Sequence, residues 1–163
     1  MKSNKHKIEL VYEWAIDNKI DILGLAETNI SKKEGFFMSK DLSRYRGFWS
    51  DSDTAKKKGS EVGILVEERW ERHLGQVDRV SEYMIVANFI FKQLELMVIM
   101  VYMPPNNKEE WKKIQKAILE RYIKRTFRTQ TLIMGDLNCI VNPELDRSSN
   151  TKCSSFKRDL ILK

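Results

Sequence analysis

Two long apolar runs, separated by a short polar break, constrain the fold of this chain more than any other feature. Residues 83–91 and 94–102 are both rich in large apolar side chains, and Lys92-Gln93 divides them. Such a pair is typical of a β-hairpin. Because apolar residues fill consecutive positions rather than alternate ones, both faces of the strands must be buried. The sequence therefore predicts two central strands in a sheet that is covered on each side.

Three segments have the periodicity of amphipathic helices. Ser3 or Asn4 could cap the first, whose apolar stripe is Ile8, Val11, Tyr12, Ala15 and Ile16. Asn107 is predicted to cap the second in a capping-box pattern with Glu110, and its inner stripe is Trp111, Ile114, Ile118 and Tyr122. Its basic outer face is interpreted as solvated, with a nucleic-acid patch as the alternative. A third helix is expected over 154–162.

Short apolar runs predict further strands. Buried strands are expected over 22–26, 62–66 and 132–134. The stretch 31–60 is polar, with scattered aromatic residues, and is interpreted as a long surface loop with one short strand near 45–49. A charged turn region is expected between residue 66 and the hairpin.

Composition excludes several classes of protein. The 163 residues, 42% of them hydrophobic, supply apolar material for one core, so a single domain over 1–163 is expected. The longest apolar run, 96–103, is too short to span a membrane, and the polar start of the chain is not a signal peptide, which predicts a soluble intracellular protein. Cys139 and Cys153 have neither metal-site nor disulfide spacing. The net charge of +6 mildly favours a polyanionic partner such as nucleic acid.

The run Leu132-Ile133-Met134 leads into a short polar motif. Asp136 and Asn138 follow it at alternate positions, where the strand is predicted to end. In a two-residue repeat their side chains point to the same side, so one could hold a water or a metal while the other donates a hydrogen bond to the same substrate. The alternative is an ordinary Asx turn, which Gly-Asp-x-Asn sequences commonly form.

Four motifs occur in the order that is typical of one enzyme superfamily. They are Asp21-Ile22-Leu23-Gly24-Leu25-Ala26-Glu27-Thr28, Gly63-Ile64, Val101-Tyr102-Met103-Pro104-Pro105-Asn106 and Met134-Gly135-Asp136-Leu137-Asn138. Through them the chain resembles the endonuclease/exonuclease/phosphatase superfamily. Within it, Pro104-Pro105-Asn106 and Leu145-Asp146-Arg147-Ser148-Ser149 resemble the apurinic-type endonucleases of non-LTR retrotransposons.

The resemblance implies a role for four residues. Glu27 matches the family's metal-binding glutamate, and the implied cofactor is Mg²⁺, with Mn²⁺ as the alternative ion. Asp136 matches the aspartate that orients or deprotonates the attacking water, and Asn138 the amide that holds the phosphate. Tyr102 matches the tyrosine beside the scissile phosphate. On the residues alone, Tyr102 could instead end a strand with its ring in the core, and Glu27 could be a surface carboxylate.

The resemblance also implies a fold and a substrate. The expected fold is an α/β, four-layer αββα sandwich of two mostly antiparallel sheets (DNase I-like), incomplete because the family's first strand and its C-terminal Ser-Asp-His region have no counterpart. The expected function is Mg²⁺-dependent hydrolysis of DNA phosphodiester bonds, weak or lost in this chain. Another phosphodiester substrate stays open. The alternative is a non-catalytic retroelement remnant that binds nucleic acid.

Overall fold

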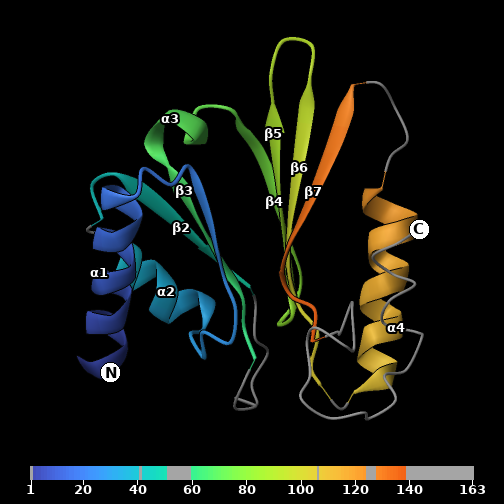
Figure 1. Cartoon of the computed structure of the whole chain (residues 1–163), viewed down its shortest axis with the longest axis horizontal. Helices are drawn as coiled ribbons and strands as arrows, with labels where there is room; N and C mark the ends of the chain where they lie inside the picture. The colour runs from blue at the N-terminus through green and yellow to red at the C-terminus, as the bar shows by residue number, and fades with distance from the viewer. Residues whose placement is uncertain (1, 41, 51–59, 106, 124–127, 139–163) are drawn as a thin grey trace, which may run out of the picture.

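Two β-sheets lie face to face, and helices cover their outer sides. The computed structural model describes residues 2–40, 42–50, 60–105, 107–123 and 128–138. In Figure 1, α1 and α2 lie outside one sheet and α4 lies outside the other. The predicted αββα order of layers is therefore confirmed.

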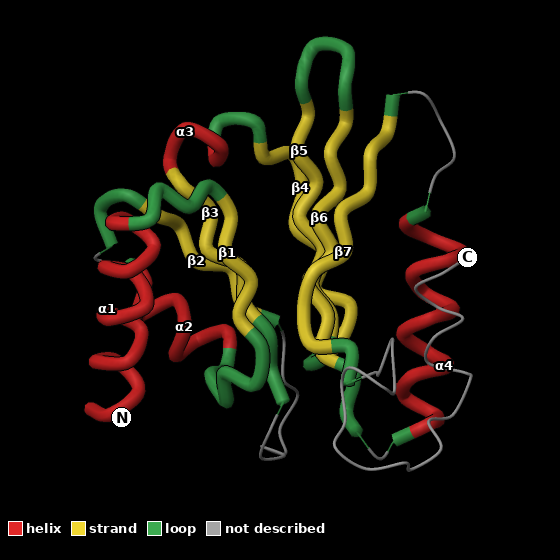
Figure 2. The backbone as a smooth tube through the Cα atoms, in the orientation of Figure 1, coloured by secondary structure: helices red, strands yellow, loops and turns green. Residues whose placement is uncertain are grey.

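Each sheet has a simple strand order, which Figure 2 traces along the backbone. The smaller has the order β1-β3-β2 and contains β1 (Ile22–Leu25), β3 (Gly63–Glu67) and β2 (Tyr45–Trp49). The larger has the order β4-β5-β6-β7 and contains β4 (Leu74–Ser81), β5 (Met84–Ile90), β6 (Glu95–Tyr102) and β7 (Thr129–Asp136). All pairs are antiparallel except β6 and β7, which are parallel. The helices are α1 (Lys2–Asp17), α2 (Lys32–Ser39), α3 (Glu68–Glu71), α4 (Lys108–Ala117) and the π-helical turn η1 (Ile118–Tyr122).

The hairpin of β5 and β6 forms the centre of the larger sheet, as its apolar runs predict. Ile85 pairs with Met100 and Val86 with Ile99, and all four side chains are buried. One face of the hairpin packs toward the smaller sheet, and the other lies under α4. The four residues of the predicted inner stripe of α4, Trp111, Ile114, Ile118 and Tyr122, are also buried.

The smaller sheet separates two apolar clusters, because neighbouring residues of a strand point to opposite faces. Ile64 and Val66 of β3 belong to the cluster that also contains β5, β6 and α4. Leu65, between them, belongs to the cluster under α1 and α2. All three side chains are fully buried. The position of β3 between β1 and β2 therefore ties the N-terminal helices to the main core.

Several predictions for the connecting segments are wrong. The supposed loop over 31–60 contains α2, which begins with a capping box: Ser31 Oγ accepts a hydrogen bond from Glu34 N, and the Glu34 carboxylate accepts one from Ser31 N. The supposed turn region after residue 66 contains α3 and β4, and only the short strand at 45–49 is confirmed. α1 begins at Lys2, so neither Ser3 nor Asn4 is its N-cap.

The predicted N-cap of α4 is present in the structure. Asn107 caps this helix, because its side-chain oxygen accepts a hydrogen bond from Glu110 N at 3.1 Å.

Some predictions fall outside the described residues. They are the helix over 154–162, the loop that contains Leu145–Ser149, and both cysteines. Within the described part of the chain, no helix is long and apolar enough to cross a membrane.

β7 is not the buried strand that its apolar run predicts. Leu132 is 50% exposed and Ile133 is 40% exposed. The reason is position: β7 pairs with β6 along one side only and is the outermost described strand of its sheet. An edge strand with exposed apolar side chains is a template for pairing with other chains.

We expect Gly135→Ala to destabilise the fold strongly. Gly135 has φ +136°, and a Cβ there would lie 1.8 Å from the Val101 carbonyl oxygen. Backbone strain and this clash together should lower the free energy of unfolding by about 3 kcal/mol or more in urea titrations. Gly75→Ala is the control, because the close contacts of its Cβ would be with the flexible end of Ile90, and the nearest backbone atom, Asn88 O, would lie at an ordinary 3.7 Å. Equal unfolding midpoints for the two variants would contradict the packing described for Gly135.

We expect Leu132→Lys to reduce self-association. A lysine on the exposed edge strand removes apolar surface and disfavours strand pairing between chains. Light scattering during concentration should show later aggregation than for the unmodified chain. Leu119→Lys provides a control, since Leu119 is 54% exposed but lies on η1. If both variants delay aggregation equally, the effect comes from charge alone and not from the β7 edge.

Candidate active site

The parallel pairing of β6 and β7 places two of the predicted residues side by side. Tyr102 is the last residue of β6, and in the parallel register it lies opposite Asp136, the last residue of β7. Met103 N donates to the Asp136 carbonyl oxygen at 2.8 Å, which extends the pairing by one hydrogen bond. Two motifs that are more than thirty residues apart in the sequence therefore end at the same edge of the sheet.

Glu27 reaches this edge from the other sheet. It follows β1 and has a left-handed backbone, with φ +51°. The Asn29 amide donates to the Glu27 carbonyl oxygen at 2.9 Å, and Thr28 N donates to the Glu61 carbonyl oxygen at 3.0 Å. These bonds hold the segment against the residues that precede β3. A left-handed glutamate is uncommon, and such conformations occur preferentially where a site requires them.

Tyr102 joins the residues of the two sheets. Its side chain is only 3% exposed, its ring lies 6.2 Å from that of Tyr83, and its hydroxyl is close enough to Glu27 and Asn138 for both to act on its pKa. Burial raises the pKa of Tyr102 to about 12, helped by the hydrogen bond to Glu27 and by the charges of Glu27 and Asp136, while the Asn138 bond acts in the opposite direction. At neutral pH the hydroxyl is therefore protonated and acts as a donor.

Asn138 closes the site through a turn, not through continued strand alternation. β7 ends at Asp136, and Asn138 has a left-handed backbone with φ +45°. Asn138 N donates to Asp136 Oδ1 at 2.8 Å, and its side-chain amide donates to the Met103 carbonyl oxygen at 2.8 Å. The two-residue repeat expected for these side chains is therefore wrong, and the Asx-type turn is present. The turn nevertheless brings Asn138 to Tyr102.

The structure thus brings Glu27, Tyr102, Asp136 and Asn138 together at one edge of the two sheets. Both sequence alternatives hold in part: the Tyr102 ring is in the core, and Glu27 is an exposed carboxylate. Glu27 also lines a hollow of about 300 Å³ with Lys7. This hollow lies between α1 and the segment after β1, and Tyr102, Asp136 and Asn138 do not line it. Glu27 and Asp136 are nonetheless both exposed to solvent.

The oxygen atoms at this edge suit a hard divalent cation that keeps most of its own water. Mg²⁺ is commonly held by one or two carboxylates, with waters completing the octahedron. The exposed carboxylates of Glu27 and Asp136, which both act on Tyr102, match that pattern. Among the residues that the structure describes, no group of three or more His, Cys, Asp or Glu side chains is arranged to hold a metal. The site fits a hydrated ion and not a closed protein cage.

Two further residues at the site were missed by the sequence interpretation. Tyr83 accepts a backbone hydrogen bond from Tyr102 N at 2.9 Å, and burial raises the pKa of its hydroxyl, with the charges of Glu82, Glu110 and Glu61 adding to the effect. Glu61 is 1% exposed and left-handed, with φ +64°. The hairpin register could have revealed Tyr83, because residue 83 must lie opposite residue 102. No sequence signal marks Glu61.

We expect Glu27→Gln to lower the pKa of Tyr102, because it removes a nearby negative charge. Tyrosine titration by ¹³C NMR, assigned with Tyr102→Phe, would measure the shift. A pKa raised from 10 to about 12 means that the associated stabilisation is complete below pH 10 and is lost as the pH rises through about 12. Glu68→Gln, on α3, is the control. An unchanged Tyr102 pKa in Glu27→Gln would show that the two side chains do not interact.

Comparison with known proteins identifies the fold. No protein-family model and no curated protein matches the sequence. Among solved structures, the AP endonuclease LMAP from Leishmania major matches with a TM-score of 0.68 and 10% identity, over 98% of this chain and 61% of that one. An AP endonuclease from Archaeoglobus fulgidus matches with a TM-score of 0.67 and 19% identity, over 94% and 64%. D. rerio TDP2, complexed with a single-strand DNA product, matches with 0.53 and 14%, over 88% and 56%.

These identities are too low to show more than a shared architecture. The chain spans between 56% and 64% of the length of the three structures. The agreement nevertheless extends over nearly all of this chain, including both sheets and the helices outside them. The chain therefore has the same fold as these AP endonuclease and TDP2 structures, the DNase I-like fold.

Proposed function

We propose that this chain is a nuclease-type domain whose site at Glu27, Tyr102, Asp136 and Asn138 holds a divalent cation and a DNA phosphodiester. One observation carries the proposal: the buried Tyr102 side chain lies opposite Asp136 in the parallel register, where Glu27, Asp136 and Asn138 all act on the pKa of its hydroxyl. A phenol held between two carboxylates and an amide at a solvent-accessible edge is typical of a functional site.

Each side chain has a role that its chemistry supports. Glu27, with Asp136 beside it, would hold Mg²⁺ or Mn²⁺, and the ion would neutralise phosphate charge and favour attack by water. Asp136 is exposed and able to orient or deprotonate a water molecule. Tyr102, protonated at neutral pH, donates to a phosphate oxygen, and the Asn138 amide holds the same group in place.

Substrate identity follows from charge and from the similar structures. Two are of AP endonucleases, and the TDP2 structure contains a single-strand DNA product. The net charge of +6 is consistent with a DNA partner. Within this class, Pro104-Pro105-Asn106 supports a relationship to the apurinic-type endonucleases of non-LTR retrotransposons.

A second candidate function is binding of nucleic acid without efficient cleavage. The sequence contains two histidines, and both make contacts elsewhere: His6 lies 3.9 Å from Glu9, and the His73 ring lies 4.5 Å from Phe91. Neither contact involves Tyr102 or Asp136, so the described structure assigns no histidine partner to either residue. Loss of one positioned acid–base group typically costs a factor of about 10²–10⁴ in rate. We therefore expect weak catalysis with the metal site retained.

We expect Glu27→Gln to weaken Mn²⁺ binding, measured by electron paramagnetic resonance, by about tenfold, because it removes the carboxylate ligand. Glu71→Gln, which makes the same charge change near the start of β4, should leave Mn²⁺ binding unaltered. In the same preparations, nicking of supercoiled plasmid in Mg²⁺ should barely exceed background.

Two results would overturn parts of this proposal. Equal Mn²⁺ affinity in Glu27→Gln and the unmodified chain would remove the metal site. Robust nicking that Asp136→Ala abolishes would instead establish an efficient enzyme and eliminate the binding-only alternative. Nicking that survives Asp136→Ala would have to come from a contaminant and would count against catalysis at this site.

A further inference from the structure

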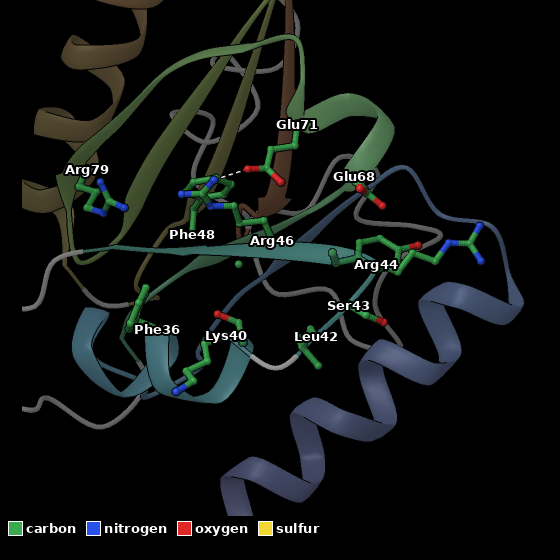
Figure 3. A pocket seen from close by; sticks show the side chains of 13 residues that line it. Phe36, Lys40, Leu42, Ser43, Arg44, Arg46, Phe48, Glu68, Glu71 and Arg79 are labelled. Carbon is green, nitrogen blue, oxygen red and sulfur yellow. Dashed lines mark hydrogen bonds and ion pairs between the residues drawn. The ribbon is translucent and has the colours of Figure 1, made fainter.

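A groove runs along the free edge of β2, away from the Tyr102 site. Figure 3 shows its main part, a hollow of about 470 Å³ between α2, β2 and α3. A second hollow of about 290 Å³ adjoins it near the start of α2. Both are lined by Phe36, Gly47 and Arg79, so they form one continuous depression, here called the β2 groove. Among the described strands, β2 pairs only with β3, which leaves this side open.

The β2 groove is strongly cationic. Its lining contains six basic residues and two acidic ones: Lys32, Lys33, Lys40, Arg44, Arg46 and Arg79 against Glu68 and Glu71. Arg46 forms an ion pair with Glu71, and Arg44 lies 3.5 Å from Glu67. These acids hold the two arginines in place without balancing the total charge. A polyanion is therefore the class of partner that complements this surface.

Phe36 presents an exposed aromatic ring among these basic residues. Phe36 is 63% exposed, although it is a large apolar side chain. The phase of α2 fixes it there, because Gly35 packs directly on the Trp49 ring and Met38 and Ser39 complete the buried face. Rotating the helix to bury Phe36 would remove Gly35 from Trp49. Nearby, the Arg46 guanidinium lies 5.6 Å from the centre of the Phe48 ring.

We propose that the β2 groove binds a single strand of nucleic acid, with a base stacked on Phe36 and the phosphates along the lysines and arginines. Grooves that combine cations with accessible aromatic rings are the usual means of binding unpaired strands. A duplex offers phosphates to such a surface but no free base face for Phe36. An acidic peptide would match the charge and leave the exposed ring unexplained.

The groove begins a short way along the chain from the candidate active site. α2 begins at Lys32, directly after the Glu27–Ile30 segment, and the capping box at Ser31 fixes the first turn. Lys32, which lines the groove, is therefore five residues from Glu27 in the sequence. This inference rests on the proposed function for its nucleic-acid substrate, whereas the binding itself requires no catalysis.

Fluorescence anisotropy with the full chain tests the proposal, using a labelled oligothymidine of about 10 nucleotides, within the usual site size, and a duplex of the same length. Phe36→Ala should weaken single-strand binding about tenfold and leave duplex binding unchanged, since it removes one stacked base. Leu119→Ala is the matched control, because Leu119 is 54% exposed on η1, which continues α4, and α4 lies outside the other sheet. Both side chains are exposed, so neither change should alter the unfolding midpoint.

Charge is tested separately. Lys33→Gln with Lys40→Gln should reduce the slope of log K against log salt by about 1.4, since each phosphate contact on a single strand contributes about 0.7. Lys112→Gln with Lys116→Gln, on the exposed face of α4, should not change the slope.

Three outcomes would overturn the proposal: equal losses in Phe36→Ala and Leu119→Ala, equal salt slopes in the two lysine pairs, or displacement of the oligonucleotide by polyglutamate at equal charge concentration. The last would assign the groove to acidic proteins. Phe36-dependent binding without a Mn²⁺ site would refute the proposed function alone, and a Mn²⁺ site without such binding would refute the groove alone.

Discussion

The parallel contact between β6 and β7 is the constraint on which the candidate active site depends. An antiparallel β7 would carry Asp136 to the far end of the sheet, whereas the parallel register places it opposite Tyr102. Parallel strands need a long connection, and α4 with η1 supplies it while covering the outer face of the hairpin. The contact is close enough to require glycine at position 135, where any Cβ would overlap the Val101 backbone. The close packing at Gly135 and the pairing of Tyr102 with Asp136 therefore depend on the same parallel register of β6 and β7.

Two of the four predicted site residues have left-handed backbones, and local hydrogen bonds offset this strain. Such conformations cost of order 1–3 kcal/mol each and persist only where their surroundings hold them. Asn29 and Thr28 hold Glu27, and the Asp136 carboxylate and the Met103 carbonyl hold Asn138. Asparagine tolerates this region better than glutamate does. The left-handed backbone of Glu27 is therefore a stronger indication of function than that of Asn138. It indicates that Glu27 adopts this conformation to place its side chain in the site, and not because the conformation is locally stable.

The sequence predicts correctly those elements in which many residues follow the same apolar pattern. The hairpin of 83–102 and the inner stripe of α4 each repeat one signal several times, so local variation does not hide it. α2 fails this test because Phe36 and Phe37 face outward and Gly35 faces inward, so the segment shows no apolar stripe and is interpreted as a loop. Its capping box was present in the sequence as Ser31 and Glu34. Exposure of Leu132 depends on which strands lie beside β7, and such long-range neighbours leave no local pattern.

Acidic and basic residues gather on different parts of the molecule, so different residues would determine catalysis and nucleic-acid affinity. The candidate active site is acidic, because Glu27 and Asp136 flank Tyr102, and Glu61, Glu82 and Glu110 act on neighbouring Tyr83. This edge attracts a cation and repels a phosphate until the cation neutralises it. The excess of basic residues lies elsewhere, in the β2 groove and on the exposed face of α4. In the proposed function, the β2 groove would hold the nucleic-acid strand, and a cation at Glu27 and Asp136 would neutralise one phosphate. Weak catalysis and effective binding are compatible in such a molecule, since different residues determine each.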